Sequence, residues 1–373
     1  MDLHRTGTKT MTFPAKKRIP DQRNFSLPGL VWCIIALCLV QVTMLSPANA
    51  DTTGSPTLET VKEARQVLSG IVQETPLIPV TEPVDGNHVW LKLENLQKTG
   101  SFKLRGAYYM ISKLSPSERQ RGIATCSAGN HAQGVAYAAR HFRIKATIFL
   151  PNNAPKEKIA ATRSYGVDVV LVNGSFDDAK AKSLEFVKKT NAVYIPPFDD
   201  NAIIAGQGTI ALEILKQLPE VDVIVVPVGG GGLISGIALT AKSLKPAIKV
   251  YGVQIASMPS MAQSIKSGHI VTLPGAPTIA DGVKVQTPGK ITFDLSRKYV
   301  DGIVTVDEKQ IKKAVMTLLD KQKILAEGAG ALSFSAIQNH LIPVTGKNVV
   351  CIVSGGNMDN STLQELIRDT REE

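Results

Sequence analysis

The segment VIVVPVGGGGLISGIALTAK, residues 223–242, decides the fold of this chain. A run of β-branched residues near 222–228 predicts a strand buried on both faces, and the apolar residues from Leu233 onward predict a helix. The glycines 229–232 stand between the two. A strand, a tight turn and a helix in this order form the crossover unit of a parallel sheet.

The four glycines also suggest chemistry. They let several backbone N–H groups converge on one anion at the start of a helix, where the helix dipole adds positive charge. We interpret this turn as a phosphate cradle rather than a flexible loop. It lacks the Gly-Lys-Ser/Thr ending of a nucleotide P-loop and the spaced glycines of a dinucleotide site. The sequence therefore predicts a cofactor phosphate and argues against a nicotinamide dehydrogenase.

The same alternation of strand and helix continues on both sides of this segment and predicts an α/β fold with largely parallel sheets. A helical pattern opens at Leu58 and runs to Ile71, before Thr75-Pro76. The predicted helices that follow are 101–114, 129–141, 155–165 and 176–189. The predicted strands are 88–93, 123–126, 145–150, 167–172, 192–195, 222–228, 248–254, 303–306 and 348–353.

The formal net charge of +10 does not indicate a nucleic-acid partner. Six of the basic residues lie before residue 29, and the remaining excess is spread singly along predicted helices without interleaved aromatics. These six are Arg5, Lys9, Lys16, Lys17, Arg18 and Arg23. We expect no nucleic-acid binding.

The N-terminal 50 residues have the pattern of an export segment. The apolar run 30–45 follows the basic stretch and precedes Ala48 and Ala50, whose small side chains suit signal peptidase cleavage before Asp51. The run is shorter than the ~20 residues that span a bilayer comfortably. We expect a signal peptide and an exported, periplasmic or secreted, protein. The alternatives are an uncleaved membrane anchor formed by 30–45, a buried helix of the folded protein, and a cytoplasmic protein that starts at Met11.

Cysteine spacing indicates neither a metal site nor a redox pair. The cysteines at 33 and 38 lie in the apolar N-terminal run, and Cys126 and Cys351 lie in predicted strands. We expect the last two to be buried free thiols; a disulfide between them is the alternative for an exported protein.

Three further loops carry polar groups at strand ends or helix starts, where open parallel sheets bind ligands. In KTGSFKLRGA, 98–107, Lys103 falls in the first turn of a helix, where the dipole favours a neutral, nucleophilic amine. The alternative is an ordinary solvated lysine. SAGNHAQG, 127–134, offers hydroxyl and amide groups for a carboxylate, whereas its histidine has the pattern of a packed helix residue. SGGN, 354–357, places a hydroxyl where it could meet a heteroaromatic nitrogen.

Together these four loops resemble the serine/threonine dehydratase family of pyridoxal-phosphate enzymes, which have the tryptophan-synthase-like fold. The resemblance runs from about Leu58 to the C-terminus, and the stretches 280–289 and 327–332 are most similar to the short biodegradative threonine dehydratases. It implies the type II fold of these enzymes: two open, twisted, largely parallel sheets with helices on both faces. We expect a large domain of 51–120 and 200–373, with a small domain, 121–199, inserted in it.

The resemblance also implies roles for single residues. Lys103 is the Schiff-base lysine of pyridoxal 5′-phosphate and the base that removes the substrate's α-proton. The remaining cofactor-binding residues are Phe102, Asn130, Gly229, Gly230, Gly231, Gly232, Leu233 and Ser354, with Ser354 at the ring nitrogen. The substrate carboxylate lies on Ser127, Ala128, Gly129, Asn130 and His131. The reaction implied is β-elimination of L-threonine, and of L-serine, to a 2-oxo acid and ammonia.

Two departures from the family pattern narrow this expectation. Ala128 stands where the family's racemases carry a second serine, which argues against efficient racemisation. Gln254 ends the strand where cation-binding relatives carry an acidic residue, so no metal is expected there. The alternatives are a serine or 3-hydroxyaspartate ammonia-lyase or racemase, and a secreted binding protein without turnover. A homo-oligomer is the common default.

Overall fold

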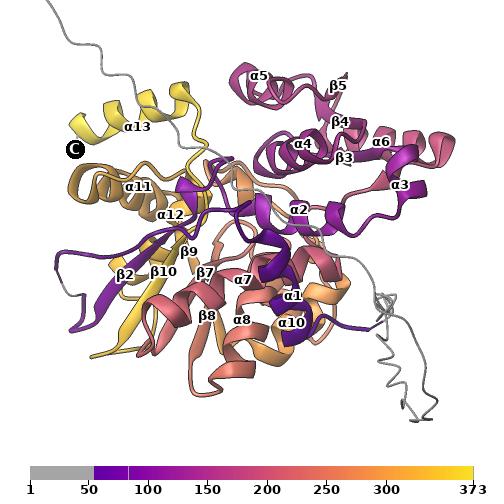
Figure 1. Cartoon of the computed structure of the whole chain (residues 1–373). Helices are drawn as coiled ribbons and strands as arrows, with labels where there is room; N and C mark the ends of the chain where they lie inside the picture. The colour runs from indigo at the N-terminus through magenta and orange to yellow at the C-terminus, as the bar shows by residue number, and fades with distance from the viewer. Residues whose placement is uncertain (1–53, 83, 373) are drawn as a thin grey trace, which may run out of the picture. The chain divides into compact units, whose positions relative to one another are not determined.

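A computed structural model describes residues 54–82 and 84–372 (Figure 1). The expected signal peptide or anchor, 1–50, lies outside the described residues. Within the residues that are described, no helix is both long and apolar enough to cross a bilayer.

The larger sheet has six strands in the order β1-β2-β10-β7-β8-β9. Only the short β1 is antiparallel to its neighbour, whereas each later pair runs parallel. Because β7 and β10 are central, both are runs of apolar, largely β-branched residues that are buried along almost their whole length. The strands are β1 (Leu77–Pro79), β2 (His88–Leu93), β7 (Val223–Pro227), β8 (Lys249–Ile255), β9 (Gly302–Val306) and β10 (Asn348–Val353).

Helices cover both faces of this sheet. One core joins alternate residues of the central strands to α7, α8 and α10, and a second core joins the other residues to α11 and α12. Successive side chains of a strand point to opposite faces of the sheet, so the apolar residues of each strand are divided between the two cores. The helices are α1 (Leu58–Leu68), η1 (Glu94–Leu96), α2 (Lys103–Ser112), α7 (Asn201–Gln217), α8 (Gly232–Leu244), α9 (Ser260–Ser267), η2 (Asp281–Val283), α10 (Lys290–Tyr299), α11 (Glu308–Gln322), α12 (Gly328–Gln338) and α13 (Asn360–Glu372).

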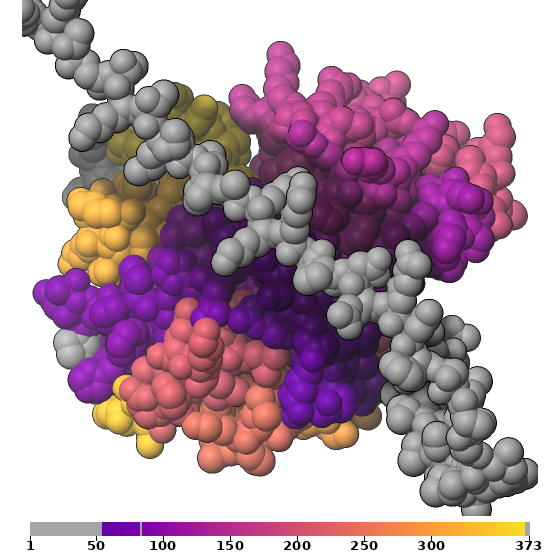
Figure 2. Space-filling view, in the orientation of Figure 1, coloured from indigo at the N-terminus to yellow at the C-terminus, as the bar shows by residue number. Residues whose placement is uncertain are grey.

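The smaller sheet has four parallel strands in the order β5-β4-β3-β6. Helices α4 and α5 pack on one face and α6 on the other. Figure 2 shows the side chains of this part, in magenta, gathered to one side of those from the six-stranded sheet. Its elements are α3 (Pro116–Arg121), β3 (Ile123–Cys126), α4 (Asn130–Phe142), β4 (Ala146–Pro151), α5 (Lys156–Arg163), β5 (Asp168–Val172), α6 (Phe176–Thr190) and β6 (Val193–Tyr194).

The fold class predicted from the sequence is confirmed, and most predicted strands agree with the structure to within two residues. The first helix is shorter than expected: it ends at Leu68, and Gly70 takes a positive φ of 73° that a helix cannot continue through. All strands of the smaller sheet lie within the segment 121–199. The boundaries of the expected domains themselves stay a prediction.

The alternative of a disulfide between Cys126 and Cys351 is wrong, because both are buried free thiols. They lie in β3 and β10, in different sheets. Burial raises the pKa of each thiol, so neither is activated as a thiolate.

Glycines let α2 lie very close to α7. A Cβ on Gly106 would stand 2.7 Å from the Ile203 carbonyl oxygen, and one on Gly206 would stand 2.6 Å from the Gly106 Cα. Glycine therefore permits an approach that alanine would block, despite its poor helix propensity. This contact fixes the helix whose first residue is Lys103.

Candidate active site

A cavity of about 1360 Å³ lies where loops from both sheets meet. Its lining includes loops that follow the carboxyl ends of β3, β7 and β10, as expected for a ligand site in parallel sheets. The structure brings all the predicted site residues together here: Phe102, Lys103, Ser127, Ala128, Gly129, Asn130, His131, Gly229, Gly230, Gly231, Gly232, Leu233 and Ser354.

Lys103 is not a solvated surface lysine. Its side chain is half-buried, and Nζ donates to the Pro197 carbonyl at 2.6 Å and lies 5.3 Å from the centre of the Phe102 ring. Burial lowers the pKa of Lys103 to about 8, against the opposing charge of Glu327. A sizeable fraction of the amine is therefore neutral at mildly alkaline pH, the form that attacks a carbonyl carbon.

The glycine loop is held in shape from outside. Gly231 has a φ of 98°, in the left-handed region, and precedes the first residue of α8. A Cβ at Gly230 would lie 2.4 Å from the Phe198 ring, and one at Gly231 would lie 2.6 Å from Met261 Cε. The buried Thr292 hydroxyl donates to the Gly230 carbonyl at 2.6 Å, and the Gly289 N–H donates to the same oxygen at 3.4 Å, so this carbonyl is held by the protein.

This cradle suits a phosphate. Backbone N–H groups of the first turn of α8 have no partner within the helix, and the helix dipole favours an anion there. Close packing leaves no room for side chains on the loop, so the backbone itself faces the ligand. Together with the amine of Lys103, the described residues fit a cofactor that carries both a phosphate and an aldehyde.

The loop from Ser127 to His131 lies at the start of α4. The amide of Asn130 is held on both sides: Nδ2 donates to Glu327 Oε1, and Oδ1 accepts from Asn357 Nδ2 at 2.7 Å. His131 is buried, and its Nε2 lies 3.0 Å from the Ile195 carbonyl oxygen. Burial lowers the pKa of this imidazole to about 3, so it is neutral and Nε2 carries the proton. His131 is thus a packed helix residue at the cavity wall, as the sequence indicated.

Ser354 follows β10 directly and is 4% exposed. Its hydroxyl lies 3.4 Å from the Ala329 carbonyl oxygen, a long contact that leaves the group able to turn toward a ligand.

Among the cavity residues for which the sequence predicted no role, three charged ones, Glu327, Asp281 and Lys158, interact with one another. Glu327 and Asp281 lie in the stretches 327–332 and 280–289, which carry the family resemblance, but no pattern in the sequence shows that Glu327 is buried. From the sequence, Lys158 would be interpreted as an exposed lysine of the predicted helix 155–165. In the structure it forms an ion pair with Asp281. Since α5 carries Lys158 and η2 carries Asp281, this ion pair joins elements of the two sheets.

The side-chain oxygen of Gln254 already has a partner within the protein. Its Oε1 accepts from the Ala262 backbone N–H at 2.8 Å, which turns the amide toward α9. Among the described residues, no three His, Cys, Asp or Glu side chains are grouped as metal ligands would be.

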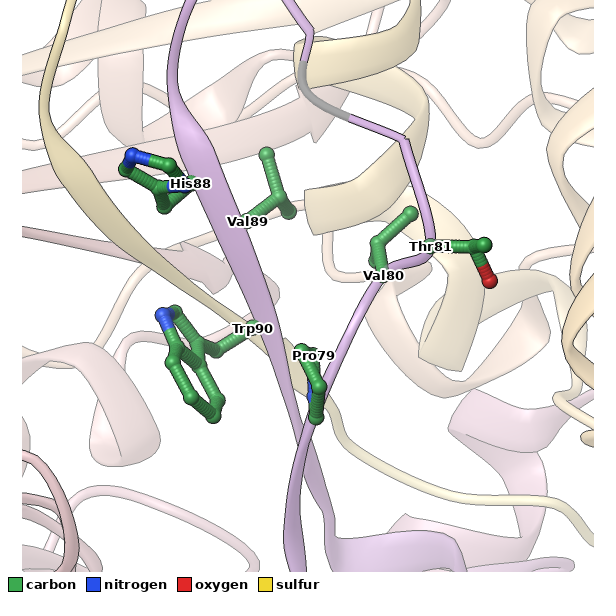
Figure 3. A pocket seen from close by; sticks show the side chains of 6 residues that line it. All are labelled: Pro79, Val80, Thr81, His88, Val89 and Trp90. Carbon is green, nitrogen blue, oxygen red and sulfur yellow. The ribbon is translucent and has the colours of Figure 1, made fainter.

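A second hollow of about 100 Å³ lies beside β1 and β2 (Figure 3). His88 and Trp90 lie on one side of β2, and Val89 on the other. The hollow is at the end of the sheet where β2 and β10 begin, whereas the large cavity lies where the strands end. It offers no group of catalytic side chains.

Comparison with known proteins agrees with this geometry. Residues 68–355 match the family model described as "Pyridoxal-phosphate dependent enzyme". The L-threonine ammonia-lyase of Thermotoga maritima is 50% identical over 313 residues, 83% of this chain and 78% of that protein.

Two solved structures have similar folds. Maize serine racemase superposes with a TM-score of 0.80 at 34% identity, covering 86% of this chain and 99% of that one. The processed form of threonine deaminase isoform 2 from Solanum lycopersicum gives 0.76 at 37% identity, covering 84% and 94%.

Proposed function

Because this chain belongs to the family of pyridoxal-phosphate dependent enzymes, we propose that it removes ammonia from L-threonine, and from L-serine, to leave a 2-oxo acid. The observation that carries this function is the half-buried Lys103 amine beside a glycine cradle in one cavity. Relatives named for threonine ammonia-lyase activity at 40–50% identity support the substrate.

Different residues of the chain bind different parts of the cofactor. The backbone amides of 229–233 hold the cofactor phosphate, and Phe102 packs against the ring. Asn130 donates to the ring hydroxyl oxygen, and the neutral Ser354 hydroxyl meets the ring nitrogen. Bound pyridoxal phosphate supplies an electron sink that makes the substrate's α-proton acidic and lets the β-hydroxyl leave.

Lys103 does the proton chemistry. Nζ is the group that would hold the cofactor through its aldehyde, and the same amine, in its free and neutral form, would take the proton from the substrate Cα. A pKa of about 8 suits this task, since the base must be partly neutral at working pH. The loop of Ser127, Ala128 and Gly129 binds the substrate carboxylate and keeps Cα in reach of Nζ.

An absorption spectrum tests the assignment. The purified protein with pyridoxal phosphate is expected to absorb at about 410–420 nm and to form 2-oxobutanoate from L-threonine. Lys103→Ala abolishes both the band and the product. Lys98→Ala, at an exposed lysine five positions earlier, keeps both. A protein that stays colourless with added cofactor would contradict the proposal.

Substrate range is tested in the same assay with L-serine and 3-hydroxyaspartate. Ala128 has no hydroxyl to return a proton from the opposite ring face, so D-serine formation from L-serine is expected to be far slower than elimination. Comparable rates of the two would instead favour a racemase. If 3-hydroxyaspartate were the only substrate turned over, the protein would instead be a 3-hydroxyaspartate ammonia-lyase.

For residues 1–50 we propose export, with cleavage after Ala50 or retention as an anchor. The composition of 30–45 and the small residues Ala48 and Ala50 support this. Cell fractionation followed by N-terminal sequencing tests it: an exported chain that begins at Asp51 is expected, and a cytoplasmic chain that begins at Met1 or Met11 opposes it. We also propose a homo-oligomer, which light scattering of the purified protein tests.

A further inference from the structure

The carboxyl group of Glu327 is enclosed at the cavity wall. The residue is 4% exposed and immediately precedes α12, and its backbone N–H donates to the Gly355 carbonyl at 3.1 Å. A Cβ at Gly355 would stand 2.3 Å from Glu327 Oε1. The loop after β10 therefore packs directly on the carboxyl group, which has little freedom to move.

The chief contact of this carboxyl group is the side chain of Asn130. Asn130 donates to it through Nδ2, while Asn130 Oδ1 accepts from Asn357 Nδ2. Asn357 Nδ2 also donates to the Thr99 carbonyl at 2.8 Å, so both of its N–H groups are used. An amide has one carbonyl and two N–H groups, so Asn130 has one N–H left for a ligand in the cavity.

We propose that Glu327 is a positioning residue that fixes the Asn130 amide so that it presents an N–H, not a carbonyl, to an oxygen of the bound cofactor. The inference rests on the proposed function. A reversed amide would set its carbonyl against an acceptor oxygen and its NH₂ against the NH₂ of Asn357. Glu327 and Asn357 thus act on the two ends of one amide, from α12 and from the loop after β10.

Several charged groups face Glu327: Asp281 from η2, Lys158 from α5 and Lys103 from α2. Burial, with Asp281, raises the pKa of Glu327 to about 7, against the two lysines and the Asn130 hydrogen bond. Both the neutral and the ionised carboxyl group keep an oxygen that accepts from Asn130. The positioning role therefore needs the acceptor and not the charge, and glutamine should replace glutamate.

Affinity of the apo-protein for pyridoxal phosphate tests this without reference to turnover. Glu327→Ala removes the acceptor and should weaken binding roughly tenfold, whereas Glu327→Gln should stay within about twofold of the wild type. The double variant Asn130→Ala/Glu327→Ala should bind no more weakly than Asn130→Ala alone, because Glu327 acts through Asn130. Glu157→Ala, at an exposed carboxylate on α5, is the matched control.

The outcomes separate the two proposals. Independent, additive losses in the double variant, or wild-type affinity of Glu327→Ala, would overturn the positioning role while leaving the proposed function intact. A wild-type protein that does not bind the cofactor would overturn both. If Glu327→Ala does not fold, Glu327→Met, of similar volume and without an acceptor, serves in its place with the same expectation.

Discussion

Lys103 and Glu327 face one cavity, and burial moves the pKa of each toward neutrality, from opposite sides. Burial disfavours a charged group, so it lowers the pKa of the amine to about 8 and raises that of the carboxyl group to about 7. Each group opposes this effect on the other, because an ammonium beside a carboxylate stabilises both charges. Near neutral pH, both groups are therefore present in charged and in neutral forms.

The raised pKa of Glu327 predicts how stability depends on pH. The folded chain binds this proton more tightly than the unfolded chain, where the group titrates near 4.5, so the stabilisation is complete below pH 4.5 and is lost as pH rises to about 7. The loss amounts to at most about 3 kcal/mol. Glutamine at position 327 does not titrate. As the pH rises from 5 to 8, the free energy of unfolding of the apo wild type should therefore fall relative to that of Glu327→Gln. Urea titrations measure both, and parallel pH curves would contradict the assignment.

Thr292 offers a second test at the residue scale, on the glycine loop. Thr292→Val keeps the shape but removes the shorter of the two hydrogen bonds to the Gly230 carbonyl, and leaves the one from the Gly289 N–H at 3.4 Å. Held by the longer hydrogen bond alone, the peptide presents its N–H to a phosphate less often, so the dissociation constant for pyridoxal phosphate should rise by up to roughly tenfold. Thr190→Val, on the exposed end of α6, controls for the loss of a hydroxyl. Unchanged affinity for inorganic phosphate and for the cofactor would show that the loop holds its shape unaided.

At the scale of elements, a buried ionic network fixes α2. Arg105 is fully buried and donates to Glu94 beside β2 and to Glu213 on α7, at 2.7 Å each. Lys92 of β2 shares Glu213, also at 2.7 Å. The helix that begins with Lys103 is thereby tied to the sheet and to α7, two residues from the reactive amine.

Arg105→Ala should destabilise the protein by about 3–5 kcal/mol, because it leaves two carboxylates buried without their common partner. The free energy of unfolding in urea measures this directly. Lys62→Ala, at an exposed ion pair of α1, should cost less than about 1 kcal/mol. A loss for Arg105→Ala as small as that of the control would mean that water enters and solvates the carboxylates.

The sequence could predict strands more accurately than helix starts. Buried parallel strands are compact β-branched runs, and the expected 123–126 and 348–353 agree with β3 and β10 to the residue. The helix expected from Ser101 begins at Lys103 instead, because Ser101 forms a β-bridge with Gly355 and Phe102 N–H donates to the Ser354 carbonyl. These contacts join residues more than 250 positions apart in the sequence, so a local sequence pattern cannot predict them.

The same limit explains which site residues could be predicted. Lys103 and the glycines belong to contiguous motifs whose composition is unusual, so they stand out from the sequence. The roles of three other residues, Glu327, Asp281 and Lys158, depend on their burial and on their interactions with one another. They meet only when three separate segments fold onto one cavity.

At the scale of the whole molecule, the cavity uses both sheets. The cradle, Ser354 and Glu327 come from the six-stranded sheet and its helices, whereas Asn130 and Lys158 come from the four-stranded one. We expect the smaller sheet to be the less stable of the two, because β5 is exposed along much of its length and β6 has only two residues. A ligand that contacts both parts should therefore stabilise the smaller one most.

This predicts a change in how the protein unfolds. With Trp32→Phe, Trp90 of β2 is the single tryptophan and its fluorescence reports the six-stranded sheet. Without cofactor, the loss of far-ultraviolet circular dichroism on heating should begin before the change in Trp90 fluorescence, since the smaller sheet unfolds first. Pyridoxal phosphate at about 100 times its dissociation constant adds about 2.7 kcal/mol to the native state, and both transitions should then rise and coincide. Lys103→Ala should lose most of this shift because its affinity falls. Coincident transitions without cofactor would mean that the two sheets already unfold as one cooperative unit.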